Sequence, residues 1–248
     1  MSKLSEITDI PVKCELGNTV FKKFFYENAK LNRSDRDLFI QSIDKIKWEY
    51  CLKNETINIK PFKDDIREYG EVEILKIELK IPNKTKRIAE IVMRAIPYPM
   101  VLIFQYTNEI QLFTAHQRKN LSDNNKNTLE ELIFTDWINI DDFDETDEKQ
   151  LFESLNIKNL SFTNFYTFYK DIVDALIKYN TSKLIGEPVT EDADEVKSLY
   201  DDLTLIDDEI EFIKSKIKKE TQFNRRLEMN MQIKELEAKK NDLVSKLN

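Results

Sequence analysis

The chain has 248 residues, of which 41% are hydrophobic and 34% charged, the balance of a soluble globular protein. Its net charge of −8 and pI of about 5.0 argue against a strongly basic, obligate nucleic-acid binder. No apolar run approaches the roughly 20 residues that cross a bilayer, and the first residues lack the apolar core of a signal peptide. Cys14 and Cys51 stand alone and indicate reduced thiols, so we expect a cytoplasmic protein without membrane contact.

The first three quarters of the chain predict an α/β (α+β) body, a mixed sheet flanked by helices. In chain order we expect a helix capped by Ser34, strands at 48–52, 56–60 and 72–81, a helix at 85–96, strands at 100–104, 110–116 and 132–138, and helices at 148–156 and 162–179. The order helix, strands, helix, strands, helices sets the fold class. We expect a body at residues 1–180, a linker at 181–192 and a coiled-coil hairpin at 193–248.

The last quarter of the chain carries two heptad stripes. Apolar residues recur in steps of three and four at Val196, Leu199, Leu203, Ile206, Ile210, Ile213 and Ile217, and again at Met229, Ile233, Leu236, Leu243 and Leu247, with Lys240 at the one polar position. Each stripe needs a partner helix to bury it. The registers of the stripes differ by two residues, which disfavours one continuous helix, because coiled coils are usually interrupted by three or four.

Folding the chain back near residues 221–222 aligns the stripes. The pairs that then meet are Val196 with Leu247, Leu203 with Lys240, Ile206 with Leu236, Ile210 with Ile233, and Ile213 with Met229. Residues 191–213 have a net charge of −9 and residues 214–248 one of +5, so an acidic arm lies against a basic arm. Asn224 is a candidate turn residue or helix cap. A coiled coil between two chains is the alternative, because periodicity fixes register but not chain identity.

Five large apolar residues fall off this seam. They are Leu205, Phe212, Phe223, Leu227 and Met231. We expect some of them to contact the body, a second subunit or a different protein, and we take Phe212, Phe223, Leu227 and Met231 as the partner-binding candidates, although scattered apolar surface residues are also normal in monomers.

Recognisable catalytic motifs are scarce. The three glycines are isolated, which excludes a phosphate loop or dinucleotide fingerprint. His116 is the only histidine, and with Cys14 and Cys51 it makes no metal-binding spacing, so we expect no resident metal or cofactor.

One candidate catalytic constellation combines Asp64, Asp65, Glu78 and Lys80. Glu78 and Lys80 form a Glu-x-Lys triplet on an expected strand, and the two aspartates lie thirteen to fourteen residues upstream, shortly after Pro61. The spacing resembles the signature of restriction-endonuclease-like nucleases, in which two carboxylates hold Mg²⁺ and a lysine helps to activate water. The competing interpretation is a half-exposed strand on which Glu and Lys alternate without function.

A second candidate is a basic patch formed by Lys80, Arg118 and Lys119. These side chains could contact nucleic-acid phosphates, or they could be solvated surface charges.

Three stretches together resemble the bacterial domain-of-unknown-function 4391 family. They are residues 24–30 (FFYENAK), 95–99 (AIPYP) with the apolar strand that follows, and 219–225 (KETQFNR). The resemblance covers nearly the whole chain but transfers no catalytic residues. It implies a genetic neighbourhood of restriction–modification and Swi2/Snf2-type helicase genes, and hence a role in antiviral defence.

The sequence therefore favours an accessory protein of a DNA-related defence system. We expect it to dock through its coiled-coil tail onto a helicase or restriction–modification subunit, and to meet nucleic acid through that partner. A homodimer formed through the tail is a further option. The alternative is a metal-dependent nuclease, the only case in which Mg²⁺ is expected.

Overall fold

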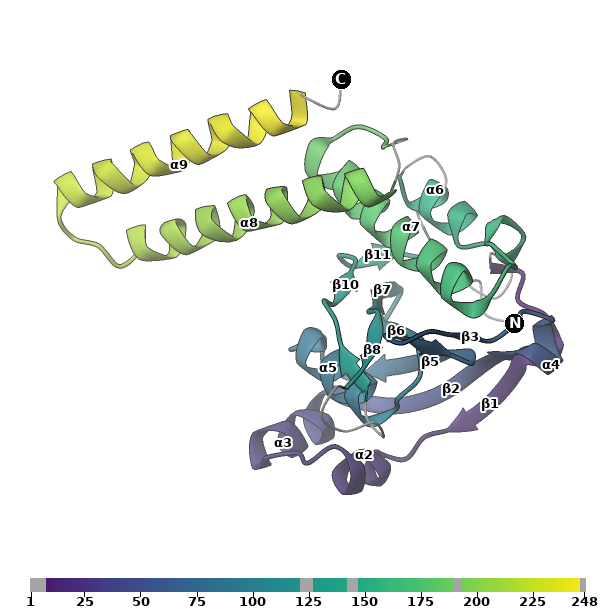
Figure 1. Ribbon diagram of the computed structural model, residues 1–248. Helices are drawn as coiled ribbons and strands as arrows, with labels where there is room; N and C mark the ends of the chain where they lie inside the picture. Colours follow the sequence, from purple (N-terminus) through teal and green to yellow (C-terminus); the bar gives the residue numbers. More distant parts are fainter. Residues whose placement is uncertain (1–7, 121–126, 142–146, 190–192, 246–248) are drawn as a thin grey trace. The chain divides into compact units, whose positions relative to one another are not determined.

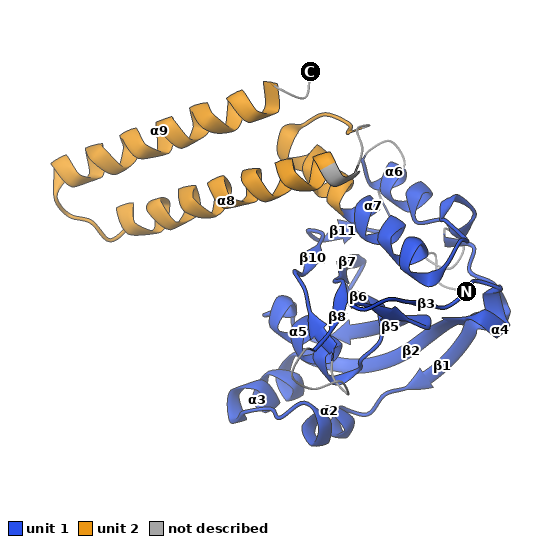
Figure 2. Cartoon of the chain, in the orientation of Figure 1, with its two compact units in different colours: residues 1–176 blue, residues 177–248 orange. Residues whose placement is uncertain are grey.

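The computed structural model describes residues 8–120, 127–141, 147–189 and 193–245 (Figure 1). The chain divides into two compact units, residues 1–176 and 177–248 (Figure 2). The division falls inside helix α7 (Phe165–Ile185), which continues into the stretch that the sequence assigned to a linker. The expected mixed α+β class, with a helical hairpin at the C-terminal end, is confirmed.

A seven-stranded mixed sheet forms the centre of the first unit among the described residues. Its strands are β1 (Glu15–Thr19), β2 (Ile43–Lys53), β5 (Glu71–Leu79), β6 (Met100–Tyr106), β7 (Glu109–Thr114), β10 (Ile133–Phe134) and β11 (Ile138–Asn139). Their spatial order is β1-β2-β5-β6-β7-β10, and β11 also pairs with β7. Strands β5 and β6 are parallel and joined by helix α5 (Thr85–Ala95), whereas the other pairs are antiparallel.

Helices cover both faces of this sheet (Figure 1). Helices α2 (Lys22–Asn28), α3 (Arg33–Ser42) and α5 share one core with β2, β5, β6 and β7. On the other face, an apolar cavity of about 70 Å³ is lined by Leu155, which directly follows α6 (Asp147–Ser154), by the 3-10 turn η2 (Ile157–Asn159) and by α7. Two faces buried in this way explain why β6 begins as an unbroken apolar run.

Short elements complete the unit. They are the 3-10 turn η1 (Val12–Cys14), helix α4 (Asn54–Ile57), and two small ladders, β3 (Phe62–Lys63) with β4 (Glu68–Tyr69) and β8 (Gln117–Lys119) with β9 (Asn127–Leu129).

Three sequence-based expectations are corrected. The strand at 56–60 is instead helix α4, which the left-handed residue Asn58 ends. The cap of α3 is Asn32, whose side chain accepts a hydrogen bond from the Asp35 amide, and Ser34 lies inside the helix. The strand at 132–138 splits into β10 and β11, because Thr135 between them turns its hydroxyl onto the Leu112 amide.

The second unit contains the end of α7 and the antiparallel helices α8 (Ala193–Ile217) and α9 (Phe223–Ser245) (Figures 1 and 2). Within the ranges described above, none of the helices combines the length and apolarity that a bilayer crossing requires.

Candidate functional site

The seam between α8 and α9 contains eight of the apolar residues that the heptads predict. Ile206, Ile210, Ile213 and Ile233 form a buried cluster, and Ile217, Met229, Leu236 and Leu243 pack against it. The two helices therefore bury each other's stripe within one chain. The expected pair of Val196 and Leu247 cannot be compared, because Leu247 lies outside the described residues.

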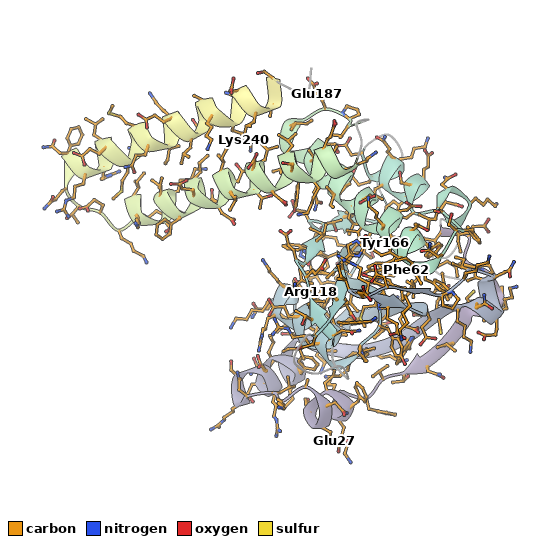
Figure 3. The ribbon with its side chains drawn as sticks, viewed as in Figure 1. Glu27, Phe62, Arg118, Tyr166, Glu187 and Lys240 are labelled. Carbon is orange, nitrogen blue, oxygen red and sulfur yellow. The ribbon has the colours of Figure 1, made fainter. Side chains whose placement is uncertain are left out.

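Lys240 occupies the one polar position of the seam. Its Nζ atom donates to both carboxylate oxygens of Asp207, at 2.8 Å each (Figure 3). The ammonium group of a lysine cannot lie in an apolar layer unpaired, so the side chain reaches an acid on the facing helix. The acidic and basic arms thus meet in at least one direct contact.

The hairpin turns without glycine or proline, through residues 218–222. The Glu220 carboxylate accepts hydrogen bonds from the amides of Thr221 and Gln222, at 2.8 Å each, and lies 3.8 Å from Arg225. These bonds satisfy donors ahead of α9 that no helix carbonyl can reach. Asn224 is not the turn residue expected from the sequence, since it lies in the first turn of α9.

The predicted partner-binding residues are exposed on the hairpin. Phe223 is 77% exposed, Phe212 58%, Met231 56% and Leu227 52%. The three on α9 follow one another at intervals of four, so they form a stripe along one side of the helix. On α8 the Lys216 ammonium lies 4.1 Å from the centre of the Phe212 ring. The seam accounts for none of these side chains.

The predicted catalytic residues do not come together. Glu78 lies near the end of β5, where it pairs with Gln105 of β6. Asp64 lies beyond the opposite end of that strand pair. Its carbonyl oxygen accepts a hydrogen bond from the Lys119 side chain. Lys119 follows β7, which runs antiparallel to β6, so the chain at Lys119 has passed the first residue of β6. The seven residue steps from Glu71 to Glu78 alone span about 23 Å of extended strand.

The individual environments of these residues fit structural roles. The Asp64 carboxylate accepts bonds from the amides of Ile66 and Arg67, which close the turn between β3 and β4 and lower the pKa of Asp64. Asp65 is exposed beside it. Glu78 lies 3.7 Å from Lys76 on the same strand face. The amide of Lys80 donates to the Ser42 carbonyl, past the end of β5.

The basic candidates are also dispersed. Lys80 lies at the end of β5, whereas Arg118 and Lys119 belong to β8 at the other end of the sheet. The Arg118 side chain is exposed (Figure 3), whereas the Lys119 ammonium group donates a hydrogen bond to the Asp64 carbonyl oxygen. Lys119 and Lys63 line a polar hollow of about 530 Å³.

His116 lies in an aromatic cluster that the sequence did not indicate. Its Nδ1 atom is 2.8 Å from the Tyr69 hydroxyl, and the rings of Tyr166 and Tyr169 lie 5.7 and 5.5 Å away. Tyr166 also stacks on Phe62 at 5.0 Å (Figure 3). Burial lowers the pKa of His116 to about 4, so the imidazole is neutral at physiological pH. Its contacts describe a partly buried histidine that packs among aromatic rings.

The structure brings together three other residues whose proximity the sequence did not predict. Cys51 on β2 is the cross-strand partner of Glu73 on β5, and Glu71 precedes Glu73 by two residues on the same strand face. One sulfur or carboxylate oxygen from each lies within 4.8 Å of those of the other two. The Cys51 thiol is 3.7 Å from Glu71 Oε2.

A protein-family model matches the chain. The family model described as a domain of unknown function (DUF4391) covers residues 9–239, nearly the whole chain. Neither the curated proteins nor the solved structures contain a match to the chain.

Proposed function

The chain belongs to the DUF4391 family, and we propose that it is a non-enzymatic interaction protein whose helical hairpin docks onto a partner protein. The observation that carries this proposal is the division of apolar residues on α8 and α9. Ile210 and Ile233 are buried in the seam, while Phe212, Phe223 and Leu227 remain more than half exposed. Because the seam already stabilises the hairpin, the exposed side chains are available for a second protein.

The exposed side chains offer apolar area whose burial favours a complex. Complete burial of one large apolar side chain contributes roughly 1.5–3 kcal/mol. The four side chains are 52–77% exposed, so burial of their remaining surface contributes roughly 4–7 kcal/mol by the same measure, before the cost of association. Aromatic anchors such as Phe212 and Phe223 are the side chains that dominate many interfaces.

The class of partner is proposed from the genetic neighbourhood that the family resemblance implies. We infer a cytoplasmic DNA-related defence system, with a helicase or restriction–modification subunit as the partner and with nucleic acid reached through it. The acidic net charge of −8 supports a protein that depends on its partner for contact with DNA.

Co-expression with the products of the neighbouring genes tests the proposal. The variant Phe212→Ser/Phe223→Ser/Leu227→Ser/Met231→Ser should reduce co-purification of the partner at least tenfold while leaving helicity unchanged. The matched control replaces four exposed apolar residues of the first unit, Val12, Phe21, Ile40 and Ile66, by serine. Docking through the hairpin would be refuted if the fourfold serine variant co-purified as much partner as the wild type does. The same holds if a chain truncated before residue 191 co-purified as much partner as the full chain.

Two other outcomes distinguish the alternatives. A solution mass of two chains that falls to one chain in the hairpin variant indicates a homodimer in place of a different partner. DNA cleavage in Mg²⁺ that is lost in Glu78→Ala would support the nuclease alternative, for which the separation of Asp64 from Glu78 gives no common site.

A further inference from the structure

The carboxylate of Glu73 is buried without a cationic partner. The residue is 1% exposed, and its Oε2 atom accepts a hydrogen bond of 2.5 Å from Trp48 Nε1. Among the residues that the structure describes, neither Glu71 nor Glu73 forms an ion pair with a lysine or arginine. Burial raises the pKa of Glu73 to about 7, and burial followed by the charge of Glu73 raises the pKa of the Cys51 thiol. A buried carboxylate takes up a proton, pairs with a cation or binds a metal.

We propose that Cys51, Glu71 and Glu73 bind one divalent transition-metal ion of the zinc class. The three ligand atoms within 4.8 Å need only a small contraction, because ligand atoms around Zn²⁺ lie about 3.5 Å apart. The thiolate favours a borderline-soft ion over Mg²⁺ or Ca²⁺, which prefer oxygen ligands alone. Three protein ligands leave a fourth position for water or another ligand.

The surroundings of the three residues suit a metal site. The Trp48 indole holds one oxygen of Glu73, and such outer contacts fix the orientation of a ligand. A polar hollow of about 530 Å³ lies next to the cluster in the chain, since it is lined by Gly70, which directly precedes Glu71.

Metal titration of the full-length protein tests the site. After removal of bound metal with a chelator, Zn²⁺ titrated by calorimetry should bind with one-to-one stoichiometry. Co²⁺ should produce a thiolate-to-cobalt charge-transfer band. Cys51→Ser should abolish that band and weaken Zn²⁺ binding at least tenfold, and Glu73→Gln should weaken it by a similar factor. Trp48→Phe, which removes the outer contact, should weaken binding about tenfold.

Two controls keep the test decisive. Cys14→Ser alters the other free thiol, which is not part of the cluster, and should leave both the band and the affinity unchanged. Thermal unfolding of each variant without metal verifies folding, and Zn²⁺ should raise the melting temperature of the wild type but not of Cys51→Ser. The proposal is overturned if Zn²⁺ does not bind, if bound Co²⁺ lacks the thiolate band, or if Cys51→Ser and Glu73→Gln bind Zn²⁺ as the wild type does.

Discussion

Lys240 on α9 and Asp207 on α8 form a two-pronged ion pair across the hairpin seam, with Nζ 2.8 Å from both carboxylate oxygens. The lysine stands where the heptad calls for an apolar residue, and its head group leaves the apolar layer to reach an acid beside it. Lys240 is the one polar residue among the heptad positions of α9, so its pairing with Asp207 favours a single register of the two helices. Specificity of register is the best attested use of a polar residue in a coiled-coil core.

Removing the acid of this pair should weaken the hairpin. Asp207→Asn leaves the half-buried Lys240 ammonium without its counter-charge, so we expect the free energy of unfolding to fall by about 0.5–1 kcal/mol. The neighbouring exposed Asp208 offers the matched control, since Asp208→Asn removes the same charge away from the seam. Denaturant unfolding followed by helical circular dichroism measures both. An equal effect of the two substitutions would mean that net charge, not the pair, is responsible.

The hairpin could be predicted because its signal is local and repetitive. Steps of three and four over five turns specify both the buried face of α8 and the register against α9, and Ile210 and Ile233 meet accordingly. Helix α4 shows where local patterns mislead. Residues 56–60 alternate like a strand, but the Thr56 hydroxyl accepts a bond from the Lys53 amide and starts a helical turn instead.

The cluster of Cys51, Glu71 and Glu73 could not be predicted, because it depends on a β-bulge. Trp48 pairs with Leu75, and without an irregularity Cys51 would then stand opposite Val72. A register shift of one residue between Trp48 and Tyr50 places Cys51 opposite Glu73. Since a slip of one residue also exchanges the faces of a strand, only the bulge brings the thiol to the carboxylates. The spacing of the residues along the sequence does not indicate this bulge.

The Tyr169 hydroxyl should contribute to the stability of the first unit. It donates to the Met100 carbonyl at 2.7 Å and accepts from the Ala115 amide at 3.1 Å, in a fully buried position. Tyr169→Phe leaves both backbone groups without this partner, so we expect a loss of about 1–3 kcal/mol in the free energy of unfolding. Tyr166→Phe is the control, because that ring is half-exposed and packs mainly through its faces. A loss below 0.5 kcal/mol for Tyr169→Phe would show that water replaces the hydroxyl.

The ion pair between Arg87 on α5 and Asp35 on α3 should behave as a coupled unit. The guanidinium donates to both carboxylate oxygens, at 3.0 and 2.8 Å, and these bonds lower the pKa of the buried Asp35. Arg87→Met leaves the carboxylate unpaired and should cost about 1–3 kcal/mol, less than for a fully buried pair because Arg87 is partly exposed. Adding Asp35→Asn should recover most of that loss. If the losses in unfolding free energy of the two single substitutions simply add in the double variant, the two side chains are not coupled. Arg94→Met, at an exposed position of the same helix, is the control.

His116 should make the stability of the protein fall as the pH is lowered. Its folded pKa of about 4 is below the value of about 6.5 in an unfolded chain, because Tyr69, Tyr166 and Tyr169 bury the ring and Arg67 and Lys170 repel its charged form. Between these two pKa values the unfolded chain binds the extra proton. The stabilising contribution is therefore complete above pH 6.5 and is lost as the pH falls towards 4. By linkage, the loss amounts to about 1–2 kcal/mol at pH 5.

The comparison of wild type with His116→Gln isolates this contribution. The wild-type profile alone does not, because Glu73 has a folded pKa of about 7, above its unfolded value, and stabilises the protein as the pH falls through that same range. His116 is the only histidine, so no other imidazole interferes. The difference in unfolding free energy between wild type and variant should shift by about 1–2 kcal/mol from pH 7.5 to pH 5, against the wild type. A constant difference would mean that the imidazole is protonated as easily in the fold as in the unfolded chain, and that the aromatic cluster opens to water.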